Sequence, residues 1–340
     1  MSRIVLFGGS FNPIHKGHLA IAKASLKQLQ AAELWFLPTL FSPLKNVELA
    51  SFEHRCQMIE RMIKPYRKLK LSRVEAEREG LSYTYDTVNV LMDRYPQHQF
   101  IWLMGSDQMV KFDQWYKHTE LIDLIEFAVY PRDEQHTIDK PFIKIKAMDI
   151  YPDASQAIRQ GAVHYTSAKI VRYFMENALY VDSIVKESLS EARFAHVQAM
   201  TELALRLADA HHLDRSQVYL AAMLHDIAKE WPKEKLKQWL MFVNPDYLNK
   251  AAAIWHQKVG SAYAARVLQI RDPRILKAIA HHVDGHCDPL SQVVYIADKC
   301  DATRAYDTTD LIDLAMRDLK RAYQLVREKQ MEYLDKEKHI

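Results

Sequence analysis

The stretch Gly8-Gly9-Ser10-Phe11-Asn12-Pro13-Ile14-His15-Lys16-Gly17-His18 decides the fold of the first half of the chain. It directly follows the short apolar run 4–7, and an amphipathic segment comes after it. The chain has only eight glycines, and three of them lie in this stretch. A buried strand, a glycine turn, two histidines and a helix start together predict a phosphate site at the carboxyl end of a parallel strand.

Segments of strand and helix character alternate through this half. The expected strands are 4–7, 33–38, 69–74, 100–104, 126–130 and 142–148, and the expected helices are 19–30, 52–63 and 82–95. Ser51 is the expected N-cap of the second of these helices. Such alternation predicts an α/β fold with a doubly wound parallel sheet of the Rossmann type.

From about residue 155 the strand signals fade and helical periodicity takes over. The expected helices are 170–177, 191–211, 215–229, 233–242, 258–268, 273–282, 291–298 and 310–333. The second half is therefore predicted to be all-α. We place the domain boundary between residues 183 and 184, which gives domains 1–183 and 184–340.

Composition narrows the class of protein. Apolar residues make up 49% of the chain and charged residues 26%, and the net charge of +3 gives no electrostatic reason to expect nucleic-acid or membrane binding. No apolar run approaches the roughly 20 residues that span a bilayer, and we expect no secretory signal before the first strand. Cys56, Cys287 and Cys300 are too scattered for a disulfide framework. We therefore expect a cytoplasmic protein.

The glycine–histidine stretch carries the first candidate site. Gly8 and Gly9 would let the backbone approach a phosphate without a Cβ clash, and the helix start beyond them supplies oriented N–H groups. His15 and His18 are three residues apart and so share one face of the helix start. Two imidazoles in this position can stabilise the charge that builds up when a phosphoryl group is attacked.

Residues further along the chain suit the same ligand. Asp107 follows the strand 100–104 at its carboxyl end, where a carboxylate can hold a ribose hydroxyl or a pyridine-ring substituent. Trp115 can stack on a planar ring. Lys45 and Arg159 are cations suited to phosphate.

This half, roughly residues 1–183, resembles the nucleotidyltransferase superfamily with the HxGH signature, and within it the bacterial nicotinate-nucleotide adenylyltransferases. Besides the glycine–histidine stretch, the likeness is carried by Trp35-Phe36-Leu37-Pro38-Thr39 with Lys45, His54-Arg55 with Met58, Ser82-Tyr83-Thr84 with Asp86-Thr87, and Gly105-Ser106-Asp107 with Trp115. The usual histidine before Lys45 is Leu44 here. Of a Ser/Thr-rich motif that ends in isoleucine and arginine, only Ser155, Ile158 and Arg159 survive.

The resemblance implies transfer of AMP from ATP, with Mg²⁺, to nicotinate mononucleotide, which gives deamido-NAD and pyrophosphate. It implies catalytic roles for His15 and His18. It further implies nucleotide or substrate binding by Gly8, Gly9, Ser10, Phe11, Lys45, Thr84, Gly105, Asp107, Trp115, Arg132, Ser155 and Arg159.

The second candidate site lies in the all-α half. An adjacent His225 and Asp226 at the end of an apolar helix are costly to bury unless something pairs with them, and a metal ion can. Further ligands of the same two types occur about one per expected helix: His196, His256, His282 and Asp298. Imidazole and carboxylate suit Fe, Mn, Zn or Co. Four histidines and two aspartates can hold two metals, which activate a water and hold a phosphate in line for attack.

Residues 184–335 resemble the HD-domain phosphohydrolases, and the order of the ligands is similar to that of the YqeK family of symmetrical diadenosine tetraphosphate hydrolases. The matching stretches are Phe194-Ala195-His196, residues 224–229, Trp255-His256 with Gly260, residues 278–282, and Ala297-Asp298 with Arg304. The resemblance implies two divalent or trivalent metals, iron first among them, held by His196, His225, Asp226, His256, His282 and Asp298. It implies a catalytic role for Asp226 and Lys229, with Lys229 and Arg304 facing substrate phosphates.

We therefore expect a bifunctional enzyme whose partners are ATP, nicotinate mononucleotide and diadenosine tetraphosphate, with a homo-oligomer left open. One alternative keeps the enzyme class and changes the substrate, as in pantetheine-phosphate adenylyltransferase; the 82–84 segment and Trp115 argue against it. Another alternative makes one domain a non-catalytic nucleotide sensor that regulates its neighbour.

Overall fold

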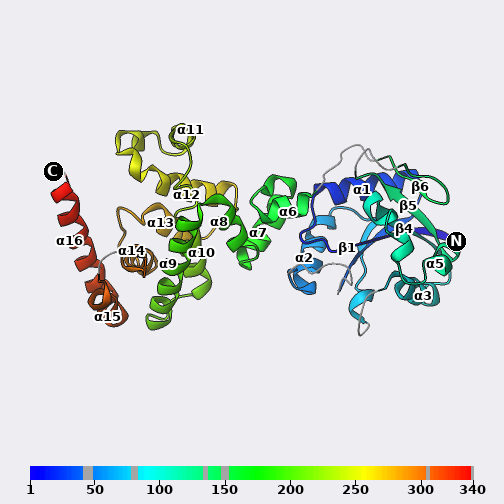
Figure 1. The fold of residues 1–340 in the computed structure, drawn as a ribbon, viewed down its shortest axis with the longest axis horizontal. Helices are drawn as coiled ribbons and strands as arrows, with labels where there is room; N and C mark the ends of the chain where they lie inside the picture. Colours follow the sequence, from blue (N-terminus) through cyan, green and yellow to red (C-terminus); the bar gives the residue numbers. More distant parts are fainter. Residues whose placement is uncertain (41–48, 78–82, 133–136, 147–152, 304–306, 338–340) are drawn as a thin grey trace. The chain divides into compact units, whose positions relative to one another are not determined.

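The computed structural model describes residues 1–40, 49–77, 83–132, 137–146, 153–303 and 307–337 (Figure 1). The contacts within the chain divide it into two compact units, Met1–Ile170 and Val171–Ile340, which we describe separately. The boundary expected at 183/184 stays a prediction. No helix in the described ranges is both long and apolar enough to cross a membrane.

The first unit is built on a six-stranded sheet with the order β3-β2-β1-β4-β5-β6. The strands are β1 (Ser2–Gly9), β2 (Glu33–Pro38), β3 (Leu69–Leu71), β4 (His98–Gly105), β5 (Glu126–Tyr130) and β6 (Ile143–Lys144). All pairs are parallel; Val5 of β1 lies opposite Leu34 of β2 on one side and Ile101 of β4 on the other. The predicted doubly wound sheet is confirmed. Because the order reverses between β1 and β4, their carboxyl ends frame the crevice where such sheets bind ligands.

Helices and short 3₁₀ turns connect these strands (Figure 1). They are α1 (Lys16–Gln28), α2 (Phe52–Ile63), η1 (Val74–Glu77), α3 (Thr84–Arg94), α4 (Ser106–Met109), η2 (Phe112–Gln114), α5 (His118–Leu124), α6 (Ala154–Arg159) and η3 (Val163–Tyr165), before α7 (Ala168–Glu176). Ser51 caps α2 as predicted, because its Oγ accepts the His54 N–H at 3.2 Å. The strand expected over 69–74 is wrong in its second half, where the chain turns into η1.

The second unit is helical throughout its described part, as predicted. Its helices are α8 (Val181–Ser188), α9 (Glu191–Ala210), α10 (Arg215–Leu224), α11 (Lys233–Val243), α12 (Trp255–Arg266), α13 (Pro273–Ala280), α14 (Pro289–Cys300), α15 (Thr309–Arg317) and α16 (Leu319–Glu337), with the 3₁₀ turns η4 (Pro245–Asn249) and η5 (Ala252–Ile254). Helix α8 was not predicted.

Most predicted helices of this unit differ from the structure by up to three residues at an end, and two differ by more. The helix expected over 310–333 is two helices, because Asp318 leaves the helical conformation and its carboxylate accepts the Arg321 N–H at 3.0 Å, which starts α16. The helix expected over 215–229 ends at Leu224. Residues 225–230 form turns instead, and these turns set the direction of His225 and Asp226.

Candidate functional site

The two histidines of the glycine–histidine stretch cap the start of α1. The His18 N–H donates to Nδ1 of His15 at 3.4 Å, and the His15 N–H donates to Nδ1 of His18 at 3.3 Å. Their ring centroids lie 3.7 Å apart and both side chains are buried. Since each Nδ1 accepts a hydrogen bond, each neutral ring carries its proton on Nε2, the form that donates to a phosphate oxygen.

Charged residues from neighbouring strand ends surround this pair. Arg132 follows β5, and its Nε lies 3.2 Å from Oδ1 of Asp107, which follows β4. The Arg132 N–H donates to Oγ of Ser106 at 3.0 Å. Burial, with a smaller contribution from the Arg132 charge, lowers the pKa of His15 to about 4. The ends of β1, β4 and β5 thus bring His15, Asp107 and Arg132 together.

The glycines are required by packing. A Cβ on Gly8 would stand 2.6 Å from the Trp102 ring, and one on Gly9 would stand 3.1 Å from the Phe11 ring. Phe11, not a glycine, takes the left-handed conformation in this turn, with φ 46°. Its buried ring lies edge-on to His18 at a centroid distance of 4.9 Å. Gly8 and Gly9 end β1 and the turn follows at residues 12 and 13, so the predicted glycine turn is wrong in position.

Three side chains from a distant segment hold the backbone of this turn. The carbonyls of three consecutive residues accept a hydrogen bond from Ser155, Arg159 and Thr166, which we call the carbonyl clamp. Arg159 Nη1 donates to the Asn12 carbonyl at 2.5 Å, Ser155 Oγ to Pro13 at 3.0 Å and Thr166 Oγ1 to Ile14 at 3.0 Å. Ser155 and Arg159, predicted as nucleotide ligands, therefore lie beside the turn and bind its backbone. Sequence reasoning missed Thr166.

Arg55 holds the other side of the turn. Its side chain is 1% exposed, and it donates to the carbonyls of Ser10 at 2.9 Å and Ala50 at 3.0 Å. The Ala50 N–H in turn donates to Oδ1 of Asn12 at 3.1 Å. Arg55 belongs to a motif quoted above, and no role was predicted for it. The signal for a structural role was an arginine on the apolar side of an amphipathic helix.

The remaining predicted ligands of this unit lie on its helices and loops. Thr84 is the first residue of α3. Trp115 is half-buried, with ring centroids 5.5 Å from Phe112 and 6.4 Å from Trp102, so part of its surface belongs to the core. Lys45 and Ser82 lie outside the described residues.

The six predicted metal ligands meet in the second unit. All six side chains are buried. They come from α9, the turn after α10, α12, the turn after α13, and α14, and they form two groups of three: His196, His225 and Asp298 in the first group, and Asp226, His256 and His282 in the second. Within each group the ligand atoms lie within 4.8 Å of one another.

Backbone carbonyls fix the tautomers of three of the ligand histidines. Nδ1 of His225, His256 and His282 faces the backbone carbonyl three residues earlier, at 2.6, 3.0 and 2.8 Å. A carbonyl only accepts, so each Nδ1 carries the proton and each Nε2 offers a lone pair to the centre. Nε2 of His225 is buried with no hydrogen-bond partner in the described part of the chain. The donors therefore fit metal ions, which such lone pairs and carboxylates bind.

In each ligand carboxylate, one oxygen lies beside imidazole nitrogens and the other lies beside a cation. Asp226 Oδ1 lies 3.3 Å from Nε2 of His256 and of His282, and Oδ2 lies 3.2 Å from Arg193 Nη1. Asp298 Oδ1 lies 3.2 Å from Nε2 of His196, and Oδ2 contacts Nζ of Lys299. Neither cation was predicted: Lys299 directly follows Asp298 in the chain, whereas only the fold brings Arg193 to Asp226.

Of the two residues predicted to face substrate phosphates, Lys229 and Arg304, the structure describes only Lys229. Lys229 lies near the centre: burial lowers its pKa, against the opposing charges of Asp226 and Asp298. Arg304 lies outside the described residues.

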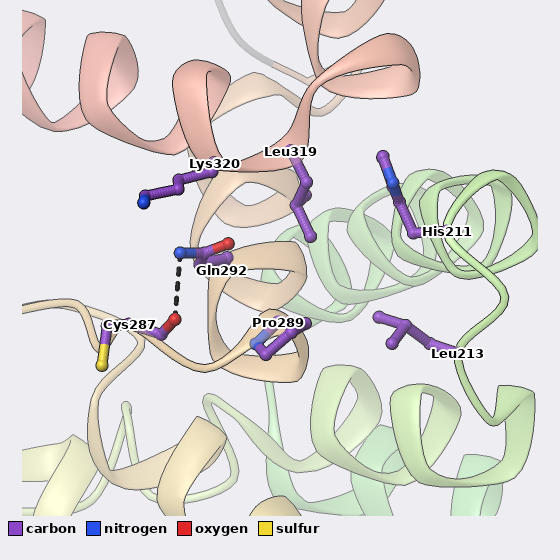
Figure 2. Close-up of a pocket in the computed structure, with 7 residues that line it drawn as sticks. All are labelled: His211, Leu213, Cys287, Pro289, Gln292, Leu319 and Lys320. Atoms are coloured by element: carbon purple, nitrogen blue, oxygen red, sulfur yellow. Dashed lines mark hydrogen bonds between the residues drawn. The ribbon is translucent and has the colours of Figure 1, made fainter.

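A pocket in this unit lies away from these ligand groups (Figure 2). Its volume is about 540 Å³, and its lining residues are His211, Leu213, Cys287, Pro289, Gln292, Leu319 and Lys320. His211 follows α9 fifteen positions after His196, which places it roughly 20 Å from His196 along the helix axis. The pocket contains none of the predicted site residues.

Comparison with known proteins divides the chain in the same way. A cytidylyltransferase-like family model matches residues 6–161, and an HD-domain model matches residues 193–303. A protein of Mycoplasma genitalium named "Probable nicotinate-nucleotide adenylyltransferase/Ap4A hydrolase" is 28% identical over 94% of this chain and 95% of its own length. The nicotinate-nucleotide adenylyltransferase of Bacillus subtilis is 36% identical over 53% of this chain and 99% of its own length.

Among solved structures, a predicted HD superfamily hydrolase involved in NAD metabolism from Clostridium acetobutylicum is 25% identical, with a TM-score of 0.43, over 46% of this chain and 86% of that one.

Proposed function

The chain belongs to the nicotinate-nucleotide adenylyltransferase family through its first half and carries an HD domain in its second, and from this we propose a bifunctional enzyme. The first unit transfers AMP from ATP to nicotinate mononucleotide, which gives deamido-NAD and pyrophosphate. The second unit hydrolyses diadenosine tetraphosphate symmetrically to two ADP. The relative from Mycoplasma genitalium, whose name joins these two activities, matches along nearly the whole chain. We place both reactions in the cytoplasm.

The paired histidines support the adenylyl transfer. His15 and His18 stand at the carboxyl end of β1, beside the crevice where the strand order reverses. Their Nε2–H groups, with the guanidinium of Arg132, offset the charge that grows on the triphosphate as the mononucleotide phosphate attacks the α-phosphorus. Asp107 holds a ribose hydroxyl or a pyridine substituent. Such a reaction needs positioning and charge stabilisation and no covalent nucleophile; Mg²⁺ enters with ATP.

Pyrophosphate release tests this half. The full chain is incubated with ATP and Mg²⁺ and with either nicotinate mononucleotide, nicotinamide mononucleotide or phosphopantetheine. We expect release with nicotinate mononucleotide and formation of deamido-NAD. Release with phosphopantetheine alone overturns the assignment. Binding of a nucleotide with no product from any acceptor favours the sensor alternative.

The buried imidazoles and carboxylates support the hydrolysis. Two ions held by His196, His225 and Asp298 and by Asp226, His256 and His282 supply Lewis acidity toward a phosphate and toward the attacking water. We infer iron first, with manganese, zinc and cobalt as alternatives. The backbone carbonyls behind the histidines hold the rings in place. Arg193, Lys229 and Lys299 stand beside the ligand carboxylates, where they can bind the polyphosphate.

Product analysis tests the second half. The protein is purified without chelators, its metals are measured, and diadenosine tetraphosphate is added. We expect metal in the purified protein and ADP as the single nucleotide product. Formation of ATP and AMP contradicts the symmetrical cleavage, and absence of metal and of turnover after metal addition contradicts the hydrolase itself.

A further inference from the structure

The two groups of metal ligands differ in what the Nδ1 atoms of their histidines face. Three of the four ligand histidines turn Nδ1 toward a neutral backbone carbonyl. His196 does not: its Nδ1 lies 3.3 Å from Oδ2 of Asp301 and 3.3 Å from Oγ1 of Thr303. The Asp301 side chain is completely buried. Within the described residues, His196 is thus the single ligand histidine whose Nδ1 faces a carboxylate.

Local bonds hold Asp301 in this orientation. The Thr303 N–H donates to Asp301 Oδ1 at 2.9 Å, and the Thr303 hydroxyl donates to the same oxygen. Asp301 follows the end of α14 and is three residues after the ligand Asp298, so one short stretch supplies both carboxylates. Because Oδ1 is bound by Thr303, Oδ2 is the oxygen directed at His196.

A carboxylate behind a ligand histidine increases the electron density on the opposite ring nitrogen and orients the ring, which strengthens its bond to a metal. The neighbouring cations do not distinguish the two ligand groups, because each group has one: Arg193 lies beside Asp226, and Lys299 lies beside Asp298. Counting the described residues, two carboxylates serve the group of His196 and one serves the group of His256.

We propose that the two metal positions are unequal: the position formed by His196, His225 and Asp298 fills first and binds its ion more tightly, and Asp301 is the positioning residue that sets this order. The inference rests on the proposed two-metal centre and adds a loading sequence to it. It also implies that the position formed by Asp226, His256 and His282 is the one that exchanges its ion readily.

Manganese titration of the full chain tests the order. Metal-free wild type and Asp301→Asn are equilibrated with buffered Mn²⁺, and bound metal is counted by elemental analysis, while electron paramagnetic resonance reports spin coupling between neighbouring ions. We expect two ions in wild type, bound in two separate steps. Asp301→Asn weakens the tighter step by about 10- to 100-fold. Asp209→Asn removes the same charge from an exposed position on α9 and leaves both steps unchanged.

Paired variants assign the affected position. His282→Ala leaves the group of His196 intact, and adding Asp301→Asn to it weakens the remaining ion. His196→Ala leaves the group of His256 intact, and adding Asp301→Asn to it changes nothing. Equal titrations of wild type and Asp301→Asn, or equal weakening in both backgrounds, overturn the inference. A wild type that binds no Mn²⁺ overturns the proposed metal centre instead.

If Asp301→Asn does not fold, as judged by circular dichroism, Thr303→Val replaces it. This variant removes the hydroxyl that orients Asp301 and keeps both carboxylates. It weakens the tighter step in the same direction and by less; a titration identical to wild type overturns the inference.

Discussion

Nε2 of His256 and Nε2 of His282 lie 3.0 Å apart. Each ring binds a backbone carbonyl through Nδ1, so both facing nitrogens carry lone pairs. Two lone pairs at this distance repel each other unless a cation lies between them. The fold therefore holds this pair in an arrangement that a bound metal ion stabilises.

Removal of metal should destabilise the second unit. An ion that binds the folded state alone stabilises it by about 3 kcal/mol when its concentration is 100 times its dissociation constant, which corresponds to a rise of a few degrees in unfolding temperature. Calorimetry of the full chain before and after chelation should show this loss, and added Mn²⁺ should restore it. An unfolding profile indifferent to chelator and to Mn²⁺ would count against a metal in this cluster.

Loss of one ligand should separate the two activities. His256→Ala leaves His282 and Asp226 without a third ligand, and we expect diadenosine tetraphosphate hydrolysis to fall at least 100-fold while deamido-NAD formation stays within about twofold. His286→Ala is the matched control, because its partly exposed ring pairs with Asp288 outside the ligand groups. Equal losses in both variants would mean that the effect is not one of metal binding.

A substitution in the first unit should impair adenylyl transfer and spare hydrolysis. His18→Ala removes a donor at the start of α1, and loss of one such donor costs about 10²- to 10³-fold in turnover. Deamido-NAD formation should fall by this factor, while hydrolysis of diadenosine tetraphosphate persists. His164→Ala serves as control, since Lys16 binds only its backbone carbonyl. Retention of adenylyl transfer by His18→Ala contradicts the proposed role.

Much of this arrangement follows from local sequence pattern. Strand β1 is a clear apolar run, helix α2 combines apolar periodicity with a capping serine, and spacing alone places His15 and His18 on one face. The break at Asp318 was missed because a capping carboxylate inside a helical pattern looks like an exposed helix residue. The exit of the chain at Leu224 was missed for a related reason: the apolar pattern continues through Ile227, which is buried by the turn.

The side chains that hold His196 and the Ile14 carbonyl from behind could not be predicted from the sequence. Asp301 faces His196 across 105 positions of the chain, and Thr166 reaches Ile14 across 152. No motif separates Asp301 and Thr166 from other polar residues that lie just outside helices. Their roles depend on tertiary packing that brings α9 to the end of α14 and η3 to the start of α1.

Stability of the first unit should depend on pH through His15. Its pKa is about 4 in the folded state, against an ordinary value of 6.5, mainly because of burial. Between these values the unfolded chain binds the proton and the folded chain does not, so stability is lost as the pH falls from 6.5 toward 4. Relative to His15→Asn, wild type should lose up to about 3 kcal/mol across this window. Urea unfolding of both proteins at several pH values measures the difference, and a constant difference contradicts it.

The carbonyl clamp should matter for both stability and catalysis. Thr166→Val leaves the buried Ile14 carbonyl without its donor, which costs about 1–3 kcal/mol. Adenylyl transfer should fall as the turn before His15 loosens, while hydrolysis is unaffected. Thr119→Val, at an exposed position of α5, controls for the substitution itself. Equal unfolding free energies in the two variants would exclude a role for the clamp.

The carbonyl clamp also has a consequence for synthesis of the chain. It joins residues separated by between 142 and 152 positions. At ribosomal rates, roughly ten to thirty seconds pass between translation of the turn and translation of the residues that hold it. The turn is thus translated early, but the side chains that bind its carbonyls are translated near the end of the unit. A nascent chain therefore acquires its nucleotide site only when nearly the whole unit has emerged.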